Sequence, residues 1–267
     1  MNIDEILEKV ASGNLSASKA KKLLQLDSIT KVGSIAKLDT GRASRKGIPE
    51  IILAEGKSPQ EVVKIANSMF QNSGKVIISR IHSSCLKEIS KTFPKKYIKT
   101  NDLARTIVIS NQKPRQKLSG SVAIITAGTA DIPVAEEAKV ILEEVGCKII
   151  TCYDVGIAGI HRLFDSLSSV IKEDVDVIIA VAGREGAMPS IIAGMVDIPV
   201  IGVPTSIGYG YGDKGISALM SMLQSCSLGI ATVNIDSGIA AGVIAVSYTH
   251  LRAHETEADL VCRLLLE

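Results

Sequence analysis

The chain of 267 residues contains no tryptophan, and its three phenylalanines and five tyrosines make up only 3% of the sequence. Proteins that bind single-stranded nucleic acids stack the bases on aromatic side chains, so this scarcity argues against such a partner. The formal net charge of +2 at pH 7 is also too small to indicate a polyanionic partner. We therefore expect no nucleic acid to bind.

The sequence also lacks the long apolar runs and paired cysteines of other protein classes. No apolar run approaches the ~20 residues that a membrane-spanning helix needs. The first residues, Met-Asn-Ile-Asp-Glu, are acidic, whereas a secretory leader begins with positive charge. The five cysteines are odd in number and form no CxxC pair, which argues against disulfides and zinc. These absences predict a cytoplasmic protein with free thiols and no membrane partner.

The first part of the chain is expected to be a helical segment followed by a small α/β domain. In residues 1–32, apolar side chains at helical spacing predict helices at Asn2–Ala11 and Ser16–Leu26. Residues 33–110 are predicted to form the small domain, with strands at Glu50–Ala54, Val76–Ser79 and Thr106–Ile109 and helices at Pro59–Gln71 and Ser83–Thr92. Residues 111–119 are polar and basic and contain a proline, which is typical of a linker.

After the linker, short apolar runs alternate regularly with helical patterns through residues 120–246. The strands are expected at Ser121–Thr126, Lys148–Tyr153, Val175–Val181, Pro199–Val203 and Ala231–Ile235. The helices are expected at Ile132–Val145, Ala158–Ile171, Ala187–Met195 and Ile216–Leu228. Such alternation requires crossover connections and predicts a three-layer, doubly wound parallel sheet of the flavodoxin or Rossmann type. The predicted fold class is therefore α/β, with a small α/β domain before the main sheet.

Three loops of this region are candidates for ligand binding. Open α/β sheets bind ligands at the carboxyl ends of their strands. The loop Gly183–Gly186 lies between a strand and a helix, and Glu185 is its one carboxylate. The loop Pro204–Gly215 carries four glycines, which allow the backbone to approach a ligand closely. The turn Ala127–Asp131 opens a helix and could hold a phosphate, although it matches neither GxGxxG nor a P-loop.

The last 21 residues differ abruptly in sequence pattern from the rest of the chain. The runs VSYTHLRAHET and DLVCRLLLE can be encoded by a common transposase sequencing adaptor and its flanking constant sequence. We therefore expect residues 247–267 to be adaptor read-through, with native C-terminal residues missing. His250, His254 and Cys262 are accordingly excluded from the candidate site.

The cysteines are the unpaired nucleophile candidates outside this tail. The two remaining histidines, His82 and His161, form no Ser-His-Asp or HExxH pattern. Cys226 falls on an apolar stripe with Leu219 and Leu223 near the end of a predicted helix. The residues alone favour a buried core thiol, because free cysteine behaves as a small hydrophobe. A helix C-terminus also disfavours a thiolate.

Several long motifs nevertheless resemble one family. TAGTADIPVAEEA, YDVGIAGIHR, VAGREGAMPSIIAGMVDIPVIGVPTSIGYG and LMSMLQSCSLGIATVNIDSG occur in this order. They resemble the pyridinium carboxylase/hydrolase of nickel-pincer nucleotide cofactor biosynthesis, the LarB family. The resemblance covers residues 33–245 and includes LDTGRASRKGIPE. The core more distantly resembles PurE, the aminoimidazole ribonucleotide carboxylase or mutase, which has a histidine in place of Ala187.

The resemblance implies a specific reaction and assembly. The substrate would be nicotinic acid adenine dinucleotide, with CO₂ or bicarbonate as co-substrate and a PurE-like core as the scaffold. A Cys226 thiolate would add to ring carbon 4, and Glu185 would remove the ring proton. Hydrolysis of the phosphoanhydride, helped by Mg²⁺, would release AMP and pyridinium-3,5-biscarboxylic acid mononucleotide on the route to lactate racemase maturation. A homo-oligomer, expected to be an octamer, is also implied.

The resemblance also supplies candidate substrate-binding residues. They are Gly128, Thr129, Asp131, Asp154, His161, Arg162, Gly183, Thr205, Ser206, Gly208, Asn234 and Asp236. Asp154 is the candidate metal ligand, and the basic residues Arg42 and Arg45 are weaker candidates for holding an anion. Arg184 stands where an apolar residue is expected, and a cation there would favour the ionised form of Glu185 and weaken it as a base.

Three alternatives remain open at this point. The chain could be a purine-type ribotide carboxylase or mutase, although Ala187 argues against it. It could be a nucleotide-binding module without catalysis. Finally, the predicted helix Ile216–Leu228 could serve only in oligomer packing, with Cys226 buried in the contact.

Overall fold

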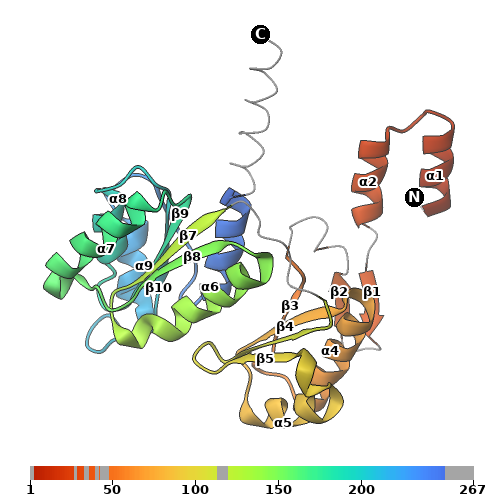
Figure 1. Ribbon diagram of the computed structural model, residues 1–267, viewed down its shortest axis with the longest axis horizontal. Coiled ribbons are helices and arrows are strands. Elements are labelled where there is room, and N and C mark those ends of the chain that lie inside the picture. Colours follow the sequence, from red (N-terminus) through yellow and green to blue (C-terminus); the bar gives the residue numbers. More distant parts are fainter. Residues whose placement is uncertain are drawn as a thin grey trace. The chain divides into compact units, whose positions relative to one another are not determined.

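A computed structural model describes residues 3–26, 29–32, 36–39, 42, 48–112 and 120–249 (Figure 1). The chain divides into two compact units. The first comprises the described parts of residues 1–100 together with 106–112, and the second comprises 101–105 with the described residues after 113. Much of the predicted linker, residues 113–119, lies outside the described residues. No helix among the described residues is long and apolar enough to cross a membrane.

The first unit contains two N-terminal helices and two small sheets. The helices α1 (Ile3–Ala11) and α2 (Ala17–Leu26) lie within a residue of their predicted bounds. An antiparallel pair, β1 (Ile29–Val32) and β2 (Ala36–Asp39), follows. The main sheet of this unit has the order β3-β4-β6-β5. Its strands are β3 (Ile51–Leu53), β4 (Lys75–Ser79), β5 (Ile98–Asn101) and β6 (Thr106–Ser110), and its helices are α4 (Pro59–Ser73) and α5 (Ser83–Thr92).

Helix α4 shows why these residues form a helix at this place. Ser58 precedes it, and the Ser58 hydroxyl accepts a hydrogen bond from the Glu61 N–H while the Glu61 carboxylate accepts one from the Ser58 N–H. This capping box satisfies two backbone donors. The helix ends at Gly74, whose φ of 66° is left-handed. Its buried face, with Val62, Ile65 and Met69, belongs to the apolar core of this unit.

The second unit is a doubly wound parallel sheet, as predicted. Its five parallel strands have the order β11-β10-β9-β7-β8. They are β7 (Ser121–Thr126), β8 (Lys148–Cys152), β9 (Val177–Ala182), β10 (Val200–Pro204) and β11 (Ile230–Thr232). Counted along the chain, this is the order 2-1-3-4-5 of flavodoxin-like folds, whose topological switch point lies between the first and third strands, here β7 and β9.

Helices cover both faces of this sheet (Figure 1). The helices are α6 (Ile132–Val145), α7 (His161–Lys172), α8 (Met188–Ala193) and α9 (Ile216–Leu223). Leu163 of α7, Ile192 of α8 and Met222 of α9 share one apolar cluster with the sheet. On α6, Ala138 and Ile141 lie against Gly242, which belongs to a helical stretch at residues 238–249. The central strands β9 and β10 are buried throughout, as expected of a sheet covered on both faces.

The two largest differences from the predictions in this unit are the end of α9 and an additional helical stretch. Helix α9 ends at Leu223 rather than Leu228. The helical stretch at 238–249 was not predicted, because Gly238 and Gly242 weaken the helical signal of its start. Residues 247–249 of the segment expected to be adaptor-derived continue this helix, and Thr249 is buried beside Gly120. Residues 250–267 lie outside the described residues.

Candidate active site

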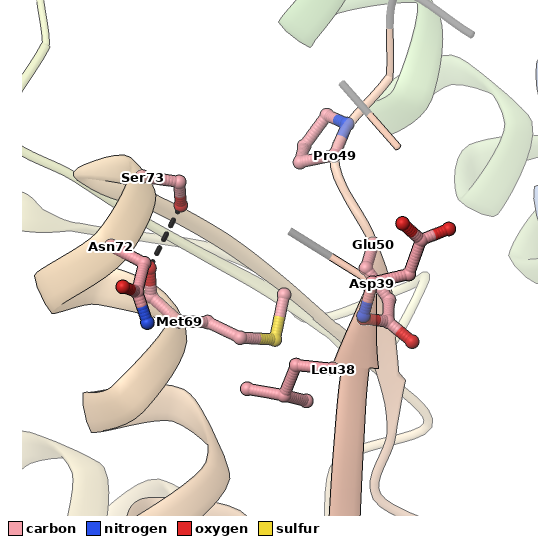
Figure 2. A pocket seen from close by; sticks show the side chains of 7 residues that line it. All are labelled: Leu38, Asp39, Pro49, Glu50, Met69, Asn72 and Ser73. Atoms are coloured by element: carbon pink, nitrogen blue, oxygen red, sulfur yellow. Dashed lines mark hydrogen bonds between the residues drawn. The ribbon is translucent and has the colours of Figure 1, made fainter. Parts of the chain in front are cut away.

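The first unit has a hollow that is too small for a substrate. Figure 2 shows it between α4 and the segment around β2. Its cavity volume is about 20 Å³. Its lining residues are Leu38, Asp39, Pro49, Glu50, Met69, Asn72 and Ser73. The Glu50 carboxylate accepts a hydrogen bond from the Asp39 N–H at 2.7 Å, and the Ser73 hydroxyl donates to the Met69 carbonyl. Since a water molecule needs ~10–15 Å³, this hollow has room for about one water molecule.

The second unit carries a larger cleft of about 360 Å³. The loop after β7 contributes Gly128 and Asp131 to its lining, and the loop after β9 contributes Gly183 and Glu185. The remaining lining residues are Ala127, Ala130, Gly156, Ile157, Ala158, Ala182, Arg184, Ala187, Met188 and Ile207. The cleft therefore lies at the carboxyl ends of β7 and β9, at the switch point where such sheets bind ligands.

Asp131 holds the loops around the cleft together. Its side chain is buried, and one carboxylate oxygen accepts a hydrogen bond from the Thr205 hydroxyl at 2.6 Å. The other accepts one from the Gly128 N–H at 2.9 Å, and the Gly183 N–H also bonds to this carboxylate. Burial raises the pKa of Asp131, and these three hydrogen bonds oppose that rise. Asp131 thus joins the loops that follow β7, β9 and β10.

Two glycines allow this close packing of loops. A Cβ atom at Gly183 would lie 2.6 Å from the Thr205 hydroxyl oxygen and against the Ile207 carbonyl. A Cβ atom at Gly156 would lie 2.5 Å from the Ala127 carbonyl oxygen. Side chains at these positions would push the loops apart. Gly183 was predicted as a site residue, whereas the role of Gly156 was missed.

Glu185 is exposed at the cleft, next to an arginine in an uncommon conformation. Arg184 has φ = 55°, which non-glycine residues rarely adopt. Its N–H donates to the Ile207 carbonyl at 3.1 Å. Its guanidinium carbon lies 4.2 Å from the ring centroid of Tyr209. Within the described part of the chain, no ion pair joins Arg184 to Glu185, because the guanidinium lies over the Tyr209 ring.

The predicted residues after β8 lie beside the cleft rather than in its lining. Asp154 has a left-handed φ of 60°, and its N–H donates to the Thr126 hydroxyl at 3.0 Å. The Arg162 guanidinium donates to the Asp154 carboxylate at 3.4 Å. His161 begins α7 and is exposed. These residues stand at the same edge of the sheet as the cleft.

The loop after β10 is hydrogen-bonded to the segment that follows β11. The Asp236 carboxylate accepts a hydrogen bond from the Ser206 N–H at 2.8 Å, and the Asp236 N–H donates to the Pro204 carbonyl at 2.9 Å. Asn234 is exposed, and its side-chain oxygen accepts from the N–H of Ile235. Asp236 and Ser206 therefore position this loop.

Cys226 lies at the opposite edge of the sheet. It is exposed, in the turn that leads from α9 into β11, so the prediction of a buried, helical thiol was wrong. Hydrogen bonds of the Ser225 hydroxyl within the turn compete with the helical pattern, since Ser225 accepts from the Ser227 N–H. The Val200 N–H donates to the Gly229 carbonyl, which places this turn at the amino ends of the strands. A five-residue strand such as β10 spans ~13 Å, so one copy does not bring Cys226 and Glu185 together.

Other predicted residues have smaller or undescribed roles. Thr129 is exposed in the turn after β7, and Gly208 lies beside Arg184. Arg42 is half-buried, while Arg45 lies outside the described residues. Tyr209 was missed, although a tyrosine between glycines in a chain with five tyrosines is an available signal. Where the structure describes the chain, no group of three His, Cys, Asp or Glu side chains forms a metal site.

Comparisons with known proteins agree with this two-unit arrangement. A family model described as AIR carboxylase matches residues 121–263, and one described as the LarB/PurE-like N-terminal domain matches residues 29–112. An uncharacterized protein of Methanocaldococcus jannaschii is 47% identical over 247 residues, covering 91% of this chain and 95% of that protein. Both domains of this chain are therefore found together in that relative.

More distant relatives match about half of this chain. The N5-carboxyaminoimidazole ribonucleotide mutase of Methanocaldococcus jannaschii is 30% identical over 142 residues, or 52% of this chain and 85% of the mutase. The mutase of Pyrococcus horikoshii is 33% identical over 144 residues, or 52% and 77%. A solved structure of a PurE2 variant from Treponema denticola is 21% identical with a TM-score of 0.35, over 53% and 96% of the two chains. With its LarB-type N-terminal domain and its AIR carboxylase domain, the chain belongs to the LarB family of carboxylase-type enzymes with a PurE-like core.

Proposed function

We propose that this chain carboxylates the pyridinium ring of nicotinic acid adenine dinucleotide and then hydrolyses its phosphoanhydride. The observation that carries the proposal is the exposure of the Cys226 thiol. An exposed thiol can reach a substrate, whereas the other described cysteines are buried or half-buried. Burial raises the pKa of Cys147 and Cys152, which makes them poorer nucleophiles at neutral pH.

The chemistry needs a nucleophile because a cationic ring cannot attack CO₂. The Cys226 thiolate would add to ring carbon 4, and the electron pair released into the ring makes carbon 5 nucleophilic. Carbon 5 would then form a bond with the carbon of CO₂. The Glu185 carboxylate would take the proton from carbon 5, and the carbon–sulfur bond would break. The thiolate leaves with its electron pair, and the pyridinium ring is restored with a second carboxylate.

A site that uses both side chains requires two copies of the chain. Cys226 and Glu185 belong to opposite edges of one sheet, so the thiol would come from a second copy. An exposed apolar stripe beside Cys226 supports this arrangement, with Ile216, Met220 and Leu223 on α9 and Leu228 in the following turn. Side chains at such spacing form one helix face, and a contiguous exposed apolar face is typical of a protein interface.

Hydrolysis would need a means of neutralising the leaving phosphate. Mg²⁺ is commonly held by one or two carboxylates together with substrate phosphates. Asp154 offers one exposed carboxylate close to the cleft, so most ligands of the proposed ion would be phosphate oxygens of the dinucleotide and water. The metal would supply charge neutralisation during cleavage of the phosphoanhydride.

The mutase relatives make a purine ribotide carboxylase or mutase the second candidate. Ala187 lines the cleft at the position where we expect the purine enzyme to have a histidine. A methyl group cannot donate or accept a proton, so the acid–base chemistry of that reaction lacks its group here. The match of residues 29–112 to the LarB/PurE-like N-terminal domain favours the pyridinium reaction of the LarB family over the purine one.

The test is to incubate the protein, with residues 247–267 removed and in parallel with the full chain, with the dinucleotide, bicarbonate and Mg²⁺. Mass spectrometry should find AMP and a mononucleotide heavier by one carboxyl group. The Cys226→Ala and Glu185→Gln variants should lose carboxylation, whereas Cys152→Ala should retain it. AMP without carboxylation would leave a hydrolase and remove the role of the thiolate. Unchanged dinucleotide with a folded, assembled protein would contradict the whole proposal.

A further inference from the structure

The cleft has an unusual distribution of charge. Of the charged residues in its lining, Asp131 and Glu185 are acidic, and Arg184 alone among these described residues is basic. Two carboxylates would repel an anionic ligand, and only Arg184 can offset them from within the cleft. A ligand with phosphate groups therefore has one position in this lining where its charge is favoured.

The structure holds Arg184 in a defined geometry. Its left-handed backbone and its hydrogen bond to the Ile207 carbonyl fix the start of the side chain. The guanidinium carbon lies over the ring of Tyr209, 4.2 Å from its centroid, which is a cation–π contact. Tyr209 is 80% exposed, so its ring is not part of the apolar core. Its contact is with the guanidinium.

A cation–π contact supplies no oxygen acceptor, so it leaves the N–H groups of the arginine able to donate to a ligand. The five donors lie in the guanidinium plane in a fixed fork. No carboxylate within the described ranges forms an ion pair with Arg184, in contrast to Arg162, which pairs with Asp154. The planar donor set matches a phosphate group, which it can bind through two parallel hydrogen bonds.

We propose that Arg184, supported by Tyr209, is a phosphate-binding residue of this cleft that selects nucleoside phosphates over nucleosides. The assignment of that phosphate to a dinucleotide rests on the function proposed above, whereas binding of a phosphate ester can be measured without it. Tyr209 acts as a positioning residue, because it orients the guanidinium rather than contacting the phosphate.

The decisive experiment is calorimetric titration of AMP and of adenosine into the full chain and its variants. The main variant is Arg184→Gly, since glycine adopts a left-handed φ without strain and should leave the fold intact. Loss of a charged hydrogen bond should weaken AMP binding roughly ten- to a hundredfold while leaving adenosine binding unchanged. Arg184→Lys keeps the charge but loses the planar donor set, and Tyr209→Leu keeps the arginine but removes the ring that positions it. Both should therefore weaken AMP binding by a smaller factor.

The matched control is Arg80→Gly. Arg80 is also an arginine with a left-handed φ, of 51°, but it lies in the first unit and pairs with Glu55. Its variant should bind AMP as the wild type does. Rising salt should weaken AMP binding to the wild type more than to Arg184→Gly, since the variant lacks the charge that salt screens.

Several outcomes would overturn the proposal. These are equal binding of AMP and adenosine by the wild type, unchanged AMP binding by Arg184→Gly, an equal loss of both ligands, or the same loss in Arg80→Gly. The two proposals fail separately. A phosphate-specific loss in Arg184→Gly without any carboxylation of the dinucleotide would remove the proposed reaction only. Carboxylation with unchanged AMP binding in Arg184→Gly would remove the role of Arg184 only.

Discussion

At the scale of single residues, the site depends on a carboxylate that is buried rather than exposed. Asp131 accepts hydrogen bonds from Thr205, Gly128 and Gly183, yet burial still raises its pKa above 3.8. The sequence indicated that Asp131 belongs to the site, through its turn. It could not show that Thr205 would contact it, because the two residues are 74 positions apart.

The raised pKa of Asp131 predicts a specific dependence of stability on pH. The folded state binds the carboxyl proton of Asp131 more tightly than the unfolded state does, so this proton stabilises the fold. That stabilisation is fully present below pH 3.8, the ordinary pKa of the side chain, and is lost as pH rises through the folded-state pKa. As pH rises from 3.8 through the folded-state pKa of Asp131, the free energy of unfolding of the wild type should therefore fall relative to that of Asp131→Asn.

Urea unfolding at a series of pH values measures this difference. Asp165→Asn, which changes an exposed carboxylate on α7, is the control for the loss of one carboxylate, and the trend of Asp131→Asn is compared with it. A difference between the wild type and Asp131→Asn that does not vary with pH would contradict the prediction.

At the scale of elements, the sequence predicted the parts that are buried on both faces. Continuous apolar runs marked β7 to the residue and β9 and β10 within two residues, because a buried strand leaves little room for polar side chains. The short strands β1 and β2 were missed, since each has four residues and carries polar side chains. The end of α9 was also missed, because the apolar periodicity continues past Leu223. The helix ends there as the Ser225 hydroxyl accepts a hydrogen bond from the Ser227 N–H.

The contact between the loops after β9 and β10 gives a prediction for Gly183→Ala. The added methyl group would overlap the Thr205 hydroxyl and the Ile207 carbonyl, so the loops must separate. We expect a loss of about 1–3 kcal/mol in the free energy of unfolding and at least ~tenfold weaker AMP binding, because the cleft changes shape. Thermal unfolding and calorimetry measure both quantities.

Gly194→Ala is the matched control for this substitution. Its φ is −76°, and the nearest atom to an added Cβ would be 3.4 Å away. It should change neither quantity appreciably. If Gly183→Ala proved equally harmless, the loops would not be packed as described.

At the scale of the whole molecule, one copy carries complementary halves of the proposed site. Glu185 stands at the carboxyl edge of the sheet, and Cys226 stands at the amino edge beside an exposed apolar stripe. The motifs alone do not show this separation, which follows from the order of the elements. Glu185 follows β9, whereas Cys226 precedes β11, and parallel strands place these two positions at opposite ends.

Mixing two inactive variants tests whether the site is shared. Cys226→Ala and Glu185→Gln, unfolded together in equal amounts and reassembled, should regain about a quarter of the wild-type carboxylation. One random pairing in four joins an intact Cys226 to an intact Glu185 from another copy. Each variant refolded alone is the control and should remain inactive. No recovery in mixed, correctly assembled protein would show that both groups act from the same copy.

The hydrogen bonds of Asp131 also couple the motions of three loops. The turn after β7, the loop after β9 and the loop after β10 each contribute one partner to the same carboxylate. A fluctuation that opens any one of them breaks a bond on which the other two depend. The three loops around the cleft should therefore open and close as a single cooperative unit. A ligand that touches only one loop then slows the opening of all three, and the far side of the rim responds to a ligand that it never contacts.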